Sequence, residues 1–246
     1  MISRIFCDRM LTSNVIRKGI SENVPESSQL LILRQLTSAC SLSVSLSCTN
    51  KGTDDCLLNR HQVQVALVEL SHIIITLGEA GASSLEDILP VLRNLLSHAD
   101  AGVRQETSAV FASISQAFPA EGRKFVLRSL NSFGSNLDAI LSLSRITINY
   151  SISMKVKSKP SSKDQHVGTA AAELLKRQAT LHGNSLAVSM LMHEFIHLVG
   201  GVAAVIIDRV FDVVSLLLNC QFDEEFAMVR QVSPFLLFVR IGTLIS

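Results

Sequence analysis

The sequence predicts an all-α protein, an α-solenoid in which antiparallel helix pairs stack side by side. Three observations lead to this fold class. The 246 residues include no tryptophan, one tyrosine, 12 glycines and 5 prolines, whereas strand-rich proteins usually carry more aromatic and turn-forming residues. Apolar residues recur at spacings of three and four along most of the chain. Two of the resulting amphipathic helices are joined by only a few residues, which makes them pack as an antiparallel pair.

The predicted helices follow one another with short breaks. In chain order we expect helices over 26–46, 60–79, 84–97, 100–118, 122–143, 167–198, 202–219 and 223–244. Gly78 marks the end of the second helix and Pro119 the end of the fourth. Gly183 is a candidate break in the sixth, and Pro90 and Pro234 are candidate bends inside helices.

The clearest antiparallel pair covers 84–97 and 100–118. Ser83 or Ser84 is placed to cap the first helix, and Asp100 the second. The inner face is expected to comprise Leu85, Ile88, Leu89, Leu92, Leu95, Leu96, Val103, Val110, Ile114, Ala117 and Phe118. The later helix 202–219 has only a narrow polar stripe, formed by Asp208, Asp212, Ser215 and Asn219. We therefore expect this helix to be covered on both sides, as in an inner layer of a stacked array.

The domain organisation predicted is one solenoid interrupted by a linker. Helical repeats are expected over 1–147, a flexible Lys/Ser-rich linker over 148–166, and further helical repeats over 167–246. The linker carries Lys155, Lys157, Lys159 and Lys163, which could also be a nuclear-localisation or anionic-lipid patch, although a solvated loop is favoured. The chain ends without a polar capping repeat, so a C-terminal truncation is predicted.

Charge and hydropathy limit the partners. A net charge of +1 gives no electrostatic case for nucleic acid. Mean hydropathy is +0.36, but the most apolar stretches are unsuitable as membrane spans: 199–220 is interrupted by Asp208, Arg209 and Asp212, and 234–245 is too short. We expect a cytoplasmic protein with no membrane span, at most peripheral to Golgi or endosomal membranes.

The cysteines predict no metal centre and no disulfide framework. They are odd in number and contain no CxxC pair: Cys7, Cys40, Cys48, Cys56 and Cys220. No secretion signal precedes them, so free or buried thiols in a reducing compartment are expected.

One motif points to a different function. His193-Glu194-Phe195-Ile196-His197 is an HExxH sequence on a predicted helix, where two imidazoles one turn apart can hold zinc while the glutamate activates water. The position of the third histidine of the extended motif is Ala203, and only carboxylates downstream could replace it: Asp208, Asp212, Asp223, Glu224 and Glu225. The favoured interpretation is a structural helix with Phe195, Ile196 and Leu198 inward and both histidines partly exposed. A zinc-dependent hydrolase remains the alternative.

The residues around Asp100 resemble a HEAT repeat. The first helix carries Asp87, Leu89, Pro90 and Leu92, and the turn reads Asp100-Ala-Gly-Val103-Arg104 before Ala109. Asp100 caps the second helix, Val103 packs inward, and Arg104 is expected to pair with a carboxylate of an adjacent repeat. A weaker copy follows at Asp223, Val229 and Arg230. Arg104 and Arg230 are 126 positions apart, or three periods of 42, within the range of HEAT arrays.

Several short segments resemble the HEAT repeat-containing protein 5 family. They are 15–22, 29–36, 70–78, 95–104 and Leu181-His182-Gly183-Asn184-Ser185-Leu186-Ala187. The family consists of very long cytosolic solenoids associated with clathrin adaptor complexes and with traffic between the trans-Golgi network and endosomes. The resemblance implies a non-enzymatic protein-binding scaffold without cofactor, metal or catalytic residues. Another HEAT scaffold, such as a transport receptor or a phosphatase regulatory subunit, remains open.

Overall fold

The computed structural model describes residues 23–46, 53–129, 131, 163–197 and 203–219, and all regular structure within them is helical. This confirms the all-α prediction. The elements are α2 (Glu26–Leu46), α3 (Thr53–Leu77), the 3₁₀ helix η1 (Gly78–Ser84), α4 (Leu85–Leu95), α5 (Ala101–Ala117), helical residues over 119–129, α7 (Lys163–His197) and α8 (Ala204–Asn219).

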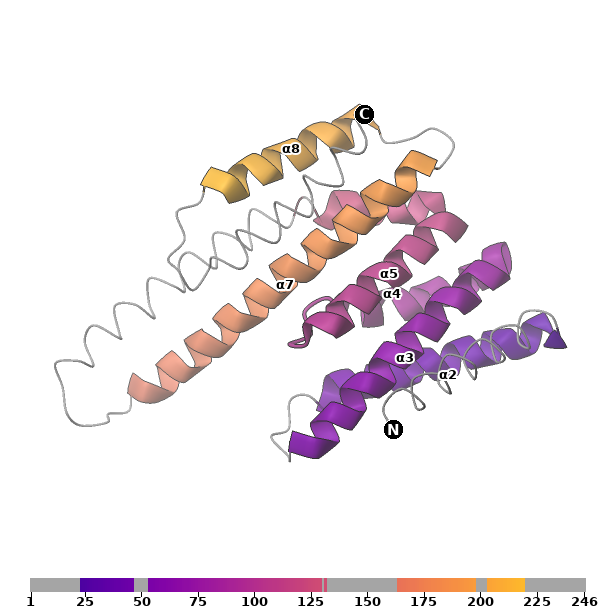
Figure 1. The fold of residues 1–246 in the computed structure, drawn as a ribbon, viewed down its shortest axis with the longest axis horizontal. Coiled ribbons are helices and arrows are strands. Elements are labelled where there is room, and N and C mark those ends of the chain that lie inside the picture. Colours follow the sequence, from indigo (N-terminus) through magenta and orange to yellow (C-terminus); the bar gives the residue numbers. More distant parts are fainter. Residues whose placement is uncertain (1–22, 47–52, 130, 132–162, 198–202, 220–246) are drawn as a thin grey trace, which may run out of the picture.

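Three of the helices form a row. Figure 1 shows α3, α5 and α7 as neighbours, with α4 behind α5 and α8 beyond α7. Helix α5 packs against α3 on one side and against α7 on the other, while α2 packs against both α3 and α4. The described helices therefore pack together around α5, which has a neighbour on each side.

The helices of the row run in the same direction. Between α3 and α5, Gln64 contacts Asp100 and the hydroxyl of Ser71 is hydrogen-bonded to that of Ser113, 42 positions later. Between α5 and α7, Arg104 donates to His182 and Gln116 donates to Glu194, both at a separation of 78 positions. Because partners advance together along both helices of each pair, the two interfaces are parallel.

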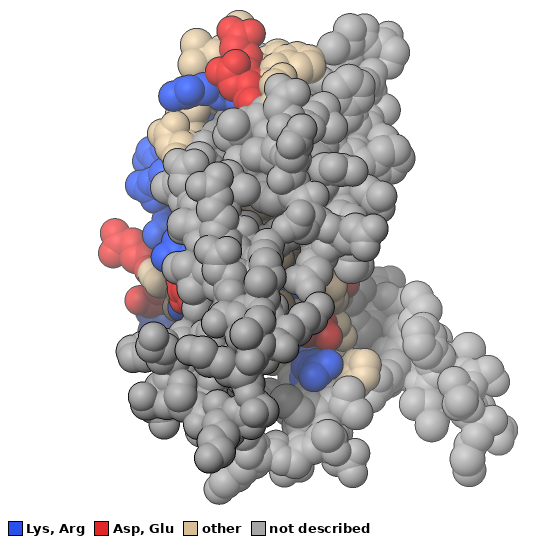
Figure 2. Space-filling view, turned by 90° about the vertical axis from the view of Figure 1, so that its left-hand side faces the viewer, with Lys and Arg blue, Asp and Glu red and all other residues tan. Residues whose placement is uncertain are grey.

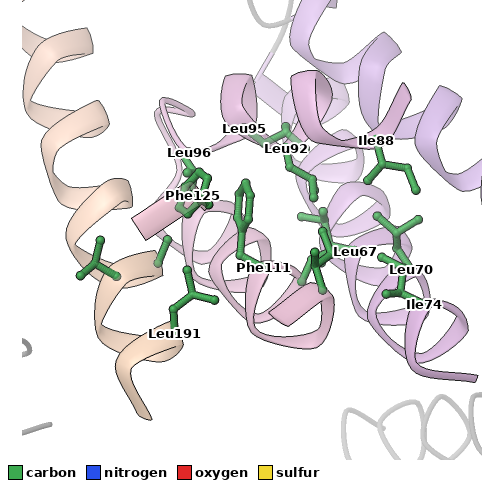
Figure 3. Close-up of a cluster of buried hydrophobic side chains, with 14 of the residues drawn as sticks. Leu67, Leu70, Ile74, Ile88, Leu92, Leu95, Leu96, Phe111, Phe125 and Leu191 are labelled. Atoms are coloured by element: carbon green, nitrogen blue, oxygen red, sulfur yellow. The ribbon is translucent and has the colours of Figure 1, made fainter. Parts of the chain in front are cut away.

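One hydrophobic core joins these helices. Figure 3 shows Leu92 of α4 opposite Leu67 of α3, with Phe111 of α5 between α4 and α7. The ring of Phe111 stacks on that of Phe125, with ring centroids 3.9 Å apart and an interplanar angle of 24°. Each predicted inner-face residue of the helix pair around Asp100 is buried, apart from three that are half-buried: Leu89, Ala117 and Phe118.

The helix boundaries agree in part with those predicted from the sequence. Helix α2 has the predicted bounds, whereas α3 begins at Thr53, seven residues before the expected start at position 60. Gly78 ends α3 with a φ of 50°, a conformation that glycine adopts without the steric cost of a Cβ. Helix α7 begins at Lys163, within the range assigned to the linker, and continues through Gly183 without a break.

The two predicted caps behave differently. Asp100 has extended backbone, and its carboxylate accepts a hydrogen bond from the Val103 backbone amide at 3.1 Å, so the cap of α5 is confirmed. Ser84 occupies the N-cap position of α4, but its backbone is helical and its hydroxyl makes no capping bond. The prediction that a serine side chain caps α4 at this position is wrong, because η1 runs directly into α4 and Ser84 lies inside a continuous helical path.

Some predictions fall on other parts of the chain. Three predictions lie outside the described residues: the helix expected over 223–244, positions 132–143 of the fifth predicted helix, and the second repeat copy at Asp223, Val229 and Arg230.

In α8, Ile206 and Val210 are buried but Val205 is 68% exposed. Val205 lies seven residues before Asp212 and so on the side of the polar stripe, whose members Asp208, Asp212 and Ser215 are exposed. The side chains at 213, 214 and 216–219 lie outside the described residues, so the expectation that α8 is covered on both sides remains a prediction.

One described stretch is long and apolar enough to cross a membrane. It runs from Arg60 to Leu95, and its most apolar window has a mean hydropathy of 1.5, with 39% of that window buried inside the protein. The stretch is interrupted by the positive φ of Gly78, and it contributes Leu67, Leu70 and Ile74 to the core. A core helix of a soluble protein passes the same test, so this stretch is weak evidence for a span.

Candidate functional site

Among the described residues a cluster of polar side chains surrounds the turn between α4 and α5, and we call it the turn network: Arg60, Gln64, His98, Asp100, Arg104 and His182. Asp100 is at its centre. One carboxylate oxygen receives the Val103 amide at 3.1 Å and the Gln64 side chain at 3.5 Å, and the other lies 3.5 Å from the Arg60 guanidinium. Asp100 thus caps α5 and ties it to α3.

Arg104 closes the same turn from inside α5. Its Nη1 donates to the carbonyl oxygens of His98 and Ala99, at 2.6 and 2.8 Å, and its Nε donates to Nδ1 of His182 on α7 at 3.1 Å. Among the described residues Arg104 forms no ion pair, and three of its five N–H groups donate to two backbone carbonyls and an imidazole. The expected pairing with a carboxylate of an adjacent repeat is therefore not seen in that part of the chain. Arg104 therefore links the turn to α7.

Both histidines of the network act as acceptors through Nδ1. His182 receives Arg104, and His98 receives the backbone amide of Asp100 at 3.0 Å. Each ring must therefore be neutral, with its proton on Nε2. Burial and the nearby charge of Arg104 lower the pKa of His182 to about 4. Burial also lowers the pKa of His98, and Arg104 and Arg60 act in the same direction while Asp100 opposes them.

At Gly183, helix α7 lies directly against the backbone of Leu96, at the C-terminal end of α4. A Cβ on Gly183 would overlap the carbonyl oxygen of Leu96 and would lie 2.9 Å from its carbonyl carbon and 3.1 Å from its Cα. Beside it, the Thr180 hydroxyl is 2.9 Å from that of Ser97. Glycine is required at this position by the close approach, and the resulting contact brings His182 within reach of Arg104.

Replacing Asp100 with alanine is expected to lower the free energy of unfolding by about 1–2 kcal/mol, because α5 loses its cap. Urea unfolding followed by circular dichroism measures the change. Asp100→Asn keeps a side-chain oxygen for the Val103 amide, so it should lose clearly less stability. Equal losses in the two variants would show that charge, rather than capping, is the contribution of Asp100.

The turn network predicts acid sensitivity. The folded protein holds His182 and His98 with lowered pKa values, so the unfolded chain binds more protons as pH falls below about 6.5. The contribution of His182 to stability is therefore complete above that pH, declines on acidification, and stops changing below about pH 4.

The experiment follows the urea midpoint between pH 7.5 and 4.5. It should fall less in His182→Asn than in the wild type, because the amide oxygen of asparagine replaces the acceptor at Nδ1. The matched control is His61→Asn on α3, where the imidazole is exposed. A pH dependence as steep in His182→Asn as in the wild type would contradict this assignment.

The HExxH sequence lies at the C-terminal end of α7. Phe195 is fully buried and the His193 side chain is 42% exposed, both as predicted. The Glu194 carboxylate accepts a hydrogen bond from the Gln116 amide at 2.6 Å and lies 3.5 Å from Nδ1 of His193. The side chains of Ile196, His197 and Leu198 lie outside the described residues. The Glu194 carboxylate is thus held by a hydrogen bond from α5.

Within the part of the chain that the structure describes, no three His, Cys, Asp or Glu side chains gather as metal ligands. Cys40 is a buried free thiol on α2, and burial raises its pKa to about 11, so it is a poor nucleophile and a poor metal ligand. Six of the singled-out residues lie outside the described residues: Cys7, Cys48, Cys220, Lys155, Lys157 and Lys159. Cys56 belongs to α3, but its side chain is not described.

Charges of both signs share the described surface. Figure 2 shows basic and acidic side chains close together on one side of the molecule, in keeping with the net charge of +1. Local pairs contribute to this mixture, such as Lys124 with Glu121 at 2.6 Å and Arg177 with Glu173 at 2.7 Å. Exposed pairs of this kind contribute little to stability.

No protein-family model matches the chain, and neither a characterised protein nor a solved structure matches it. The fold and the turn network define an all-α protein of packed helices, and its resemblance to the HEAT repeat-containing protein 5 family remains a prediction.

Sequence reasoning identified two members of the turn network, Asp100 and Arg104, from their positions in the turn. It missed Arg60, Gln64 and His98, and it noted His182 only as part of a resemblance. A usable signal was present for α7: an isolated glycine inside a helical pattern often has a packing reason, such as the close approach of another backbone.

Proposed function

We propose that the chain is part of a HEAT-type α-solenoid and that it acts as a non-enzymatic protein-binding scaffold. The observation that carries the proposal is the parallel row of α3, α5 and α7. Residues in contact across α3 and α5 are 36 to 42 positions apart, and those across α5 and α7 are 78 apart. The separations between α3 and α5 are close to one period of a HEAT array, whose equivalent helices stack in parallel on their neighbours. The 78 positions between α5 and α7 exceed one period, so that contact supports the parallel stacking but not the repeat length.

The α4–α5 pair supports the same proposal. Its turn has the Asp-x-x-Val-Arg sequence, Asp100 caps the second helix, and Val103 is fully buried. The cap and the inward valine are the roles that the HEAT resemblance assigns to these positions. Arg104 makes a different set of contacts, so the resemblance is supported for the cap and the core position but not for the arginine.

The cellular role proposed is that of the family that the sequence resembles. We place the protein in clathrin-adaptor-linked vesicle traffic between the trans-Golgi network and endosomes, as a cytoplasmic scaffold that associates with membranes peripherally through its partners. The test is binding of the chain to purified clathrin adaptor complex, measured by biolayer interferometry. Saturable binding is expected, and a phosphatase catalytic subunit and a nuclear transport cargo serve as comparison ligands. Binding to one of these but not to the adaptor would leave the scaffold in place and overturn the role in traffic.

The scaffold proposal and the zinc-hydrolase alternative predict opposite results for zinc. Under the scaffold proposal, metal analysis after dialysis against a mild chelator finds no stoichiometric zinc, and Glu194→Gln causes no change in peptide-cleaving activity. The contact between Glu194 and Gln116 favours a packing role for this glutamate. A catalytic site would instead retain about one zinc per chain through three protein ligands. Retained zinc together with peptide cleavage that depends on Glu194 would overturn the scaffold proposal.

A further inference from the structure

We draw no further inference here: the strongest candidate, the apolar surface patch around Val65 and Ile75, which are exposed on the side of α3 that faces away from the core, carries no proposal because nothing in the structure shows what covers it.

Discussion

Replacing Leu92 with alanine is expected to lower the free energy of unfolding by about 2–5 kcal/mol. Leu92 is fully buried at the centre of the core, on the side of α4 that faces α3 and α5 (Figure 3). The truncation removes apolar area from the interior and leaves a cavity that the packed helices can close only in part.

Chemical unfolding followed by circular dichroism measures this loss, and Leu175→Ala is the matched control. Leu175 lies on α7 with 66% of its surface exposed, so the same truncation there should change stability by less than about 0.5 kcal/mol. If the Leu92 variant were as stable as the Leu175 variant, the core described for α3, α4 and α5 would be wrong.

Gly183→Ala is expected to destabilise the protein by about 2 kcal/mol, although alanine favours a helix over glycine by about 1 kcal/mol. The added Cβ would overlap the carbonyl oxygen of Leu96. Overpacking of a core typically costs 1–3 kcal/mol, and here the obstructing atoms are backbone, so about 3 kcal/mol is expected before the propensity gain. Relief requires α7 to move away from the end of α4, and the bond between Arg104 and His182 should weaken with it.

Gly81→Ala provides the control for this substitution. A Cβ at Gly81 would meet nothing closer than the Cβ of Leu77 at 3.5 Å, so this variant should be as stable as the wild type or gain up to about 1 kcal/mol. The two variants are compared by urea unfolding. A Gly183 variant that is stabilised like the Gly81 variant would mean that α7 does not approach α4 as closely as described.

The local features of the fold were predictable from sequence. The spacing of apolar residues and the residue types at helix ends are local signals, and they correctly predicted α2, the cap at Asp100 and the end of α3 at Gly78. Ser84 shows the limit of such signals: a serine before a helical run is a good cap candidate, but the 3₁₀ helix preceding α4 keeps its backbone helical.

The long-range features were not predictable in the same way. Gly183 has the sequence signature of a helix break, yet it serves a backbone approach between two helices, which only tertiary packing reveals. Likewise, the pairing of Arg104 with His182 joins residues 78 positions apart, and no local pattern specifies that partner.

The parallel row of α3, α5 and α7 is the claim on which the solenoid assignment and the scaffold proposal both depend. Engineered disulfides test it most directly, because two cysteines bond only when their Cα atoms lie within about 7 Å. With the native cysteines replaced, Ser71→Cys with Ser113→Cys should form a disulfide under mild oxidation, and Gln116→Cys with Glu194→Cys, whose native contact is made by two long side chains, should be joined by a short bifunctional thiol reagent. Ser71→Cys with Glu194→Cys should react in neither way. Failure of both expected pairs in a protein that is still helical, or cross-linking of the third pair, would contradict the row.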